Sequence, residues 1–119
     1  MTDEASTAPV DLEQLADELL DRARGEKSGR AGRTLPHPVD GLRQTVIALT
    51  SGASLDEHES PGSATLLVLR GSARLAAGAD VVSLGAHQIA PIPDRRHSLH
   101  AEEDAVVLLS VAHSHSAGH

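Results

Sequence analysis

Two histidines in separate segments of the chain, His58 and His97, have the side chains best suited to chemistry. A neutral imidazole can coordinate a divalent transition metal, and it can equally accept a hydrogen bond from a small ligand. A stable metal site ordinarily has three or four protein ligands, so two histidines predict one weakly held divalent transition metal. His87 is the candidate for a third ligand, because it shares strand parity with Ile89 and could point inward.

The same residues also suit a pocket without a metal. On a strand, His58 and Ser60 would share one face while Glu57 and Glu59 face away. A buried histidine often satisfies its hydrogen bonds with a hydroxyl or backbone partner, and Ser60 offers such a hydroxyl. Gln44 stands in an apolar segment, where a polar side chain facing the interior could hydrogen-bond a ligand.

The sequence excludes several other kinds of chemistry. Cysteine is absent, which removes disulfides, thiolate metal ligands and a cysteine nucleophile. Neither a Gly-x-Ser-x-Gly segment nor a Gly-x-x-x-x-Gly-Lys segment occurs, so a serine-hydrolase elbow and a phosphate-binding loop are not expected. Phe, Trp and Tyr are also missing, so the core must be aliphatic and no aromatic platform can stack on bases.

An amphipathic helix is predicted ahead of the histidine segments. Apolar residues recur every three or four positions from Leu12 to Ala23, with charged residues between them. Asp11 suits the start of this helix and Gly25 suits its end. Residues 26–33 carry glycines and basic side chains without apolar periodicity, and they are predicted to form a loop.

The chain from Leu35 onward is predicted to form short strands. Segments bounded by Gly, Pro, Ser or Asp lie at 42–50, 64–69, 72–76, 80–84, 88–92, 97–101 and 105–112. Their number and spacing predict an all-β sandwich or barrel. Several segments are apolar on both faces, so one face lines the interior and the other needs a cover from the helix, a second sheet or another subunit. One short helix can hardly cover this surface, which predicts a homodimer packed sheet to sheet.

Length and charge narrow the class of protein further. The chain has 119 residues, enough for one compact domain, and a formal net charge of -7. An anionic surface repels phosphate backbones and acidic headgroups, so neither nucleic acid nor a membrane is an expected partner. Residues 1–10 do not look like a secretory signal, and no stretch is apolar enough to span a bilayer. We therefore expect a soluble, cytoplasmic protein.

The glycine, histidine and proline spacing resembles the two motifs of the small single-domain cupins. The matching positions are Gly52, His58 and Gly71 in the first motif, and Gly85, Pro91 and His97 in the second, with one additional residue between the proline and the histidine. The resemblance implies a cupin-type, jelly-roll-like β-barrel preceded by the N-terminal helix. The chain would then divide into a disordered start, helix and linker at 1–33, the barrel at 34–112, and a disordered histidine-rich tail at 113–119.

The metal-ligand positions of that family are only partly kept. Ser60 stands where the family has its second histidine, and Ala64 stands where it has a glutamate. The resemblance therefore implies a weak metal site at His58 and His97, with His87 as the third candidate. The residues of the expected ligand pocket are Gln44, His58, Ser60, Ala64 and His97.

Three functions fit these residues. We favour a non-catalytic module that binds a small molecule in an aliphatic barrel, with hydrogen bonds from His58, His97 and Gln44. The second is a metal-dependent enzyme of the oxygenase or isomerase type, in which the histidine pair holds a divalent ion that polarises an oxygen-bearing substrate or activates dioxygen. The third is a structural or regulatory dimer with a vestigial pocket. The fold alone does not decide among them, because this barrel hosts many unrelated activities.

Overall fold

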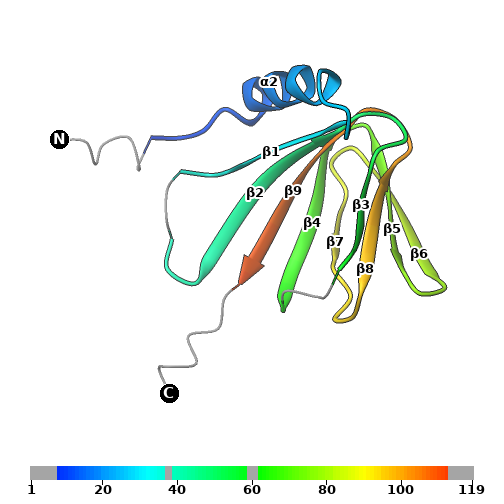
Figure 1. Ribbon diagram of the computed structural model, residues 1–119. Coiled ribbons are helices and arrows are strands. Elements are labelled where there is room, and N and C mark those ends of the chain that lie inside the picture. The colour runs from blue at the N-terminus through cyan, green and yellow to red at the C-terminus, as the bar shows by residue number, and fades with distance from the viewer. Residues whose placement is uncertain (1–7, 37–38, 59–61, 113–119) are drawn as a thin grey trace.

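Two facing sheets with a helix on the outside of one of them form the protein (Figure 1). The computed structural model describes residues 8–36, 39–58 and 62–112, with only the backbone described at 57 and 58. The elements are α2 (Leu12–Arg24), β1 (Arg30–Thr34), β2 (Leu42–Leu49), β3 (Ser54–His58), β4 (Ser63–Arg70), β5 (Ser72–Ala77), β6 (Asp80–Gly85), β7 (Ile89–Pro91), β8 (His97–Ala101) and β9 (Ala105–Ala112). The predictions for residues 1–7, Ser60 and the tail at 113–119 concern positions outside the described residues.

The helix forms where the apolar periodicity places it. The carboxylate of Asp11 caps its N-terminus and accepts hydrogen bonds from the backbone N–H groups of Glu13 and Gln14, at 3.0 and 3.2 Å. Gly25 caps its C-terminus. The buried stripe of the helix consists of Leu15, Ala16, Leu19, Leu20 and Ala23. The predicted amphipathic helix is therefore confirmed.

The nine strands described beyond the helix form two antiparallel sheets. One sheet has five strands in the order β1-β2-β9-β4-β7, and the other has four in the order β3-β8-β5-β6. Each of the predicted strand segments coincides with one observed strand to within one or two residues. The all-β architecture is confirmed, and two further strands, β1 and β3, were not predicted.

The prediction of a loop over residues 26–33 is wrong for its second half. Residues 30–34 form β1, which pairs with β2 so that Ala31 lies opposite Ala48. Four of the five β1 residues are exposed, and only Ala31 packs against the helix cluster. An edge strand with so little burial has no apolar alternation, which is why the sequence pattern indicated a loop.

Strand β3 escaped prediction for a similar reason, because Leu55 is its only apolar residue. It pairs with β8 through an irregular register: Leu55 lies opposite Leu99, and His58 lies opposite His97. One additional residue on β3 therefore stands between these two pairs. Such a bulge shifts the alternation of side chains on one strand relative to its partner.

Strand β2 buries both of its faces, and so does its neighbour β9. On β2, Ile47 and Leu49 pack into the barrel interior, whereas Val46 and Ala48 pack beneath α2. Val46 and Ala48 are fully buried, as is Val106 on β9. The helix thus provides the cover that the doubly apolar segments required. Homodimerisation stays a prediction.

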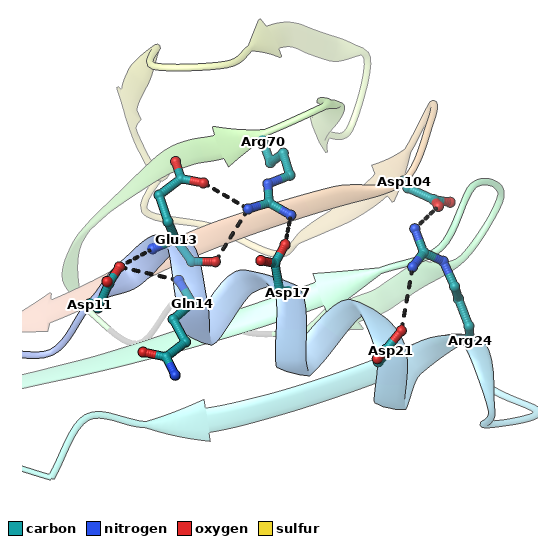
Figure 2. A network of polar contacts seen from close by, with 8 residues as sticks. All are labelled: Asp11, Glu13, Gln14, Asp17, Asp21, Arg24, Arg70 and Asp104. Carbon is teal, nitrogen blue, oxygen red and sulfur yellow. Dashed lines mark hydrogen bonds and ion pairs between the residues drawn. The ribbon is translucent and has the colours of Figure 1, made fainter.

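Ion pairs fasten the helix to the rest of the protein. Arg33 of β1 lies 3.5 Å from Glu18, and two further sets are drawn in Figure 2. Near the helix start, Arg70 of β4 donates to the carboxylates of Asp17 and Glu13, at 2.7 and 2.8 Å. These hydrogen bonds, Asp17 first, raise the pKa of Arg70 above its ordinary value. At the other end, Arg24 donates to Asp104 at 2.9 Å, in the turn before β9. Both ends of α2 are therefore held on the barrel by side-chain contacts as well as by apolar packing.

The motif glycines occupy backbone positions that favour glycine. Gly52 has φ of 87° and Gly71 has φ of 78°, both in the left-handed region. At Gly71 a Cβ atom would lie 2.0 Å from the carbonyl oxygen of Asp104, whereas at Gly52 it would meet nothing within 4 Å. Gly71 is thus required by conformation and by a close backbone approach, and Gly52 by conformation alone.

We expect Gly71→Ala to destabilise the protein clearly more than Gly52→Ala. The left-handed conformation costs an alanine roughly 1–2 kcal/mol at either position, and the contact with Asp104 adds a backbone displacement at Gly71 only. Urea unfolding of the two variants and the wild type measures the difference. Equal losses in the free energy of unfolding would contradict the close approach at Gly71.

A pH dependence follows from Asp104. The backbone N–H of Ser51 and then the guanidinium of Arg24 lower the pKa of this carboxyl group below its ordinary value. A carboxyl group with a lowered pKa in the folded state stabilises the protein above its unfolded pKa, and this contribution is lost as the pH falls through the folded value. We therefore expect Asp104→Asn to flatten the acid loss of stability below about pH 4. Asp21→Asn is the matched control, because it removes the 3.8 Å contact to Arg24 and keeps the Ser51 hydrogen bond. Identical acid unfolding curves for wild type and Asp104→Asn would refute the assignment.

Candidate functional site

His97 is the only buried residue with a polar side chain in the described part of the chain. It begins β8, whose residues alternate so that His97, Leu99 and Ala101 face the barrel interior. Only 3% of its surface is exposed. The prediction that His97 faces the interior is therefore confirmed by its position.

A backbone contact fixes the orientation of this imidazole. Nδ1 of His97 lies 2.9 Å from the carbonyl oxygen of Arg95. Because a carbonyl oxygen can only accept, Nδ1 carries the proton, and Nε2 of the neutral ring carries the lone pair. The Arg95 side chain also forms an ion pair with Asp80 at the start of β6, which holds this segment in place. In this tautomer Nε2 of His97 has acceptor character.

A small cavity lies beside His97 in the barrel. It offers about 30 Å³ of space for the centres of water-sized molecules. Its lining consists of Ile47, Leu55, Leu66, Leu75, Ile92, His97, Leu99 and Leu109. Since one water needs about 10–15 Å³ by this measure, the cavity has room for a few waters at most. The interior is therefore an aliphatic space with one polar group in its described lining.

The register brings the two candidate histidines together along the backbone. His58 closes β3 and is the cross-strand partner of His97 on β8. Directly opposed residues of an antiparallel pair have Cα atoms about 4.5–5.5 Å apart. The backbone positions therefore agree with a histidine pair at one end of the four-stranded sheet.

Ala64 faces the barrel interior, which is the orientation expected of a pocket residue. It shares the interior face of β4 with Leu66 and Val68, and it packs against the barrel core. A methyl group at this position offers no ligand to a metal and no hydrogen bond to a bound molecule. Ser60, the other substituted position, lies outside the described residues.

The assignment of Gln44 to the pocket is wrong. Gln44 shares its strand face with Val46 and Ala48, which pack beneath α2 outside the barrel. Its Nε2 donates to the hydroxyl of Ser110, its register partner on β9, at 3.0 Å. Both faces of β2 are apolar, so parity alone could not tell which of them lines the interior.

The inward orientation expected for His87 is also wrong. His87 is exposed in the turn between β6 and β7, and its backbone has φ of 72°. Its N–H donates to the carbonyl of Val68 on β4 at 2.6 Å, so the turn is tied to the five-stranded sheet. Parity with Ile89 does not lead into the barrel, because Ile89 is itself 62% exposed on the short strand β7.

The described residues hold no group of three or more side chains that could bind a metal ion. His97 is the only described ligand of the expected set that faces the interior, with His58 adjacent by register. Sequence reasoning missed the carbonyl of Arg95, which orients His97. No side-chain pattern signals a backbone acceptor two residues away, so only the structure reveals it.

Comparisons with known proteins agree with this architecture. No protein-family model and no curated protein matches the sequence. A solved structure of a conserved protein of unknown function from Streptococcus pyogenes is 29% identical, with a TM-score of 0.66, over 75% of this chain and 78% of that chain. A cupin 2 conserved barrel domain protein from Leptotrichia buccalis is 25% identical, with a TM-score of 0.65, over 73% of this chain and 42% of that chain. A salicylate 1,2-dioxygenase from Pseudaminobacter salicylatoxidans is 17% identical, with a TM-score of 0.70, over 83% of this chain and 33% of that chain.

The protein is a small cupin-type domain with an N-terminal helix, as the motif spacing predicted. Its likeness to the dioxygenase concerns the fold alone. Within the described residues, no helix has the length and apolar character needed to cross a membrane.

The orientation of His97 can be checked directly. We expect the neutral ring of His97 to be protonated at Nδ1, because the Arg95 carbonyl accepts from that nitrogen. A long-range proton–nitrogen NMR spectrum in alkaline solution distinguishes the two tautomers of an assigned histidine. The exposed ring of His87 serves as the internal comparison. A proton on Nε2 of His97 would contradict the contact with Arg95.

Proposed function

We propose that this domain binds a small molecule in its barrel and serves as a binding module rather than an enzyme. One observation carries the proposal: in the part of the barrel that the structure describes, an aliphatic lining surrounds one buried and oriented imidazole, that of His97. Such a space favours a ligand that is mostly apolar and has one polar group to be recognised. Acid–base or nucleophilic catalysis needs a second reactive group beside the first, and the described cavity lining offers none.

The geometry also defines the ligand's chemistry. The Arg95 carbonyl sets a tautomer in which Nε2 of His97 has acceptor character, so a ligand recognised by this ring needs a donor such as a hydroxyl group. The remaining lining is made of Leu and Ile side chains, which favour a compact hydrocarbon body. Because the cavity has room for only a few waters, the ligand has few heavy atoms or displaces lining side chains as it enters.

Isopropanol is a suitable probe, since it combines one hydroxyl donor with two methyl groups. We expect millimolar isopropanol to shift the methyl NMR signals of Leu66, Leu75 and Leu99 in the wild type. His97→Leu removes the acceptor and should weaken binding roughly five- to tenfold, because one hydrogen bond contributes about 1 kcal/mol. Gln44→Leu is the matched control, because it changes a polar residue outside the barrel and should leave binding unchanged.

Two results would contradict this proposal. Unshifted interior methyl signals would mean that the barrel does not admit such a ligand. Equal weakening by His97→Leu and Gln44→Leu would mean that the imidazole is not the recognition group.

A divalent metal is the second candidate ligand, and the opposition of His58 and His97 in the register favours it. Metal-binding histidines characteristically donate their other ring nitrogen to a carbonyl or carboxylate, as His97 does. A bound ion would polarise an oxygen-bearing substrate. Ala64 faces the interior without a ligand atom, so the described donors suit weak binding and not a tight site.

Restoring the family ligands tests this second candidate. We expect Ser60→His with Ala64→Glu to raise the affinity for nickel or zinc by well over tenfold, each tenfold corresponding to about 1.4 kcal/mol. Ser60→His with Thr65→Glu is the matched control, because Thr65 is an exposed neighbour of Ala64 on β4. Calorimetric titration measures both variants. No gain in the first variant would show that the ligand alignment of residues 58–64 is wrong. Nanomolar binding by the wild type would favour the metalloenzyme.

A further inference from the structure

Strand β1 lies at the edge of the five-stranded sheet, and β2 is its hydrogen-bonded neighbour (Figure 1). In an antiparallel pair, alternate residues direct both backbone groups toward the neighbouring strand. Leu35 donates its N–H to the carbonyl of Gln44 at 2.8 Å, and Thr50 donates its N–H to the carbonyl of Gly29 at 2.9 Å. Odd-numbered residues of this stretch therefore face β2, and the even-numbered residues of β1 face away from the sheet.

The outward-facing residues of β1 are Arg30, Gly32 and Thr34. In the described strands, their backbone N–H and C=O groups have no ladder partner. The N–H of Arg30 reaches the hydroxyl of Ser28 at 3.3 Å, a long contact that a pairing strand can replace. A row of unpaired backbone groups at a sheet edge is a template for another strand.

We propose that a second copy of this chain pairs with β1 in antiparallel fashion, with the two-fold axis at Gly32. Outward-facing residues then meet outward-facing residues: Gly32 lies opposite Gly32, and Arg30 lies opposite Thr34. Each such pair exchanges two hydrogen bonds, which gives about six across the interface. The result is a continuous sheet with five strands from each copy.

Charge and the number of paired outward-facing residues together favour this register. An axis at Arg30 or at Arg33 would place that arginine directly opposite the same arginine of the second copy, and two like charges in this position are unfavourable. An axis at Ala31 would pair Arg30 with Gly32 and leave Thr34 without a partner on the strand. The axis at Gly32 pairs all three outward residues and opposes no two like charges.

The space beside β1 is also compatible with a second strand. A Cβ atom at Gly32 would contact only the carbonyl of Val46 at 3.5 Å and Ile47 at 3.7 Å, both on β2 within the same sheet. An open groove of about 400 Å³ runs between α2 and β1. Its lining consists of Val10, Asp11, Gln14, Leu15, Glu18, Arg33, Thr34 and Pro36. The helix therefore leaves room for side chains that the second copy brings to this edge.

This interface does not involve the barrel interior, so it is independent of the proposed ligand. The proposed homodimer forms through the edge strand β1. The sequence analysis predicted instead a contact between sheet faces. Neutral substitutions along β1 can therefore test assembly without changing the site at His97.

Proline at position 32 provides the sharpest test. Gly32→Pro removes an N–H that points away from β2, so the β1–β2 ladder is kept and the dimer contact is lost. Gly32→Ala is the matched control, because its Cβ fits at ordinary contact distances and its N–H remains. In light scattering at about 50 µM, we expect a dimer for the wild type and Gly32→Ala, and a dissociation constant raised at least tenfold for Gly32→Pro. A monomeric wild type at this concentration would overturn the proposal.

A cross-link decides the outcome even if the proline variant fails to fold. The chain has no cysteine, so Gly32→Cys introduces a single thiol at the axis. Opposed residues in a hydrogen-bonded pair have Cα atoms about 5.5 Å apart, within the range of a disulfide. Mild oxidation should give a covalent dimer for Gly32→Cys, and none for Val81→Cys on the exposed edge strand β6. A cross-link at position 81 without one at position 32 would place the interface elsewhere and refute the proposal.

Discussion

Burial of both faces of the β2–β9 pair is the constraint on which the rest of this structure depends. Alternate residues of β2 enter the barrel, and those between them lie beneath α2, as Leu49 and Ala48 illustrate. A core without aromatic residues must reach its density with many small aliphatic contacts. The helix supplies part of these contacts through Leu19 and Leu20, so it is an integral layer of the fold. Because neither face of these strands is polar, removing the helix would expose a large apolar surface to water.

The absence of aromatic side chains from the core also determines the character of the site. In the part of the barrel that the structure describes, Leu and Ile side chains line a small cavity beside His97. An imidazole is costly to bury unless its ring nitrogens find partners, and the carbonyl of Arg95 satisfies one of them. The ring is thereby held in one tautomer, with Nε2 as the acceptor or metal ligand. A single oriented group in an apolar space is suited to recognition, and this is the basis for the binding function that we propose.

Local sequence signals were sufficient for much of the fold. The helix followed from its apolar period and from Asp11 at its start, and the interior strands followed from apolar segments between turn residues. The motif glycines were recognised by spacing, and the structure gives the physical reason for Gly52 and Gly71 in their positive φ angles. The edge strands β1 and β3 were missed because strands with few buried side chains carry no apolar alternation.

The site was predicted less completely than the fold. Parity showed that Gln44 and Val46 share a face, but on a strand apolar on both sides it could not show which face lines the barrel. His87 was assigned an inward side chain from its parity with Ile89, but Ile89 is itself exposed. The bulge before His58 likewise depends on pairing with β8, which no local pattern reveals. Which side chains line the pocket therefore depends on how the strands pair in the folded protein.

Metal analysis of the protein purified without an affinity tag tests the central claim most directly. A binding module with an aliphatic barrel and too few ligands should retain far less than one transition metal ion per chain after a mild chelator. Analysis with and without residues 113–119 separates the barrel from the histidine-rich tail. One tightly retained metal ion per chain in the shortened protein would contradict the binding-module account and favour a metalloenzyme.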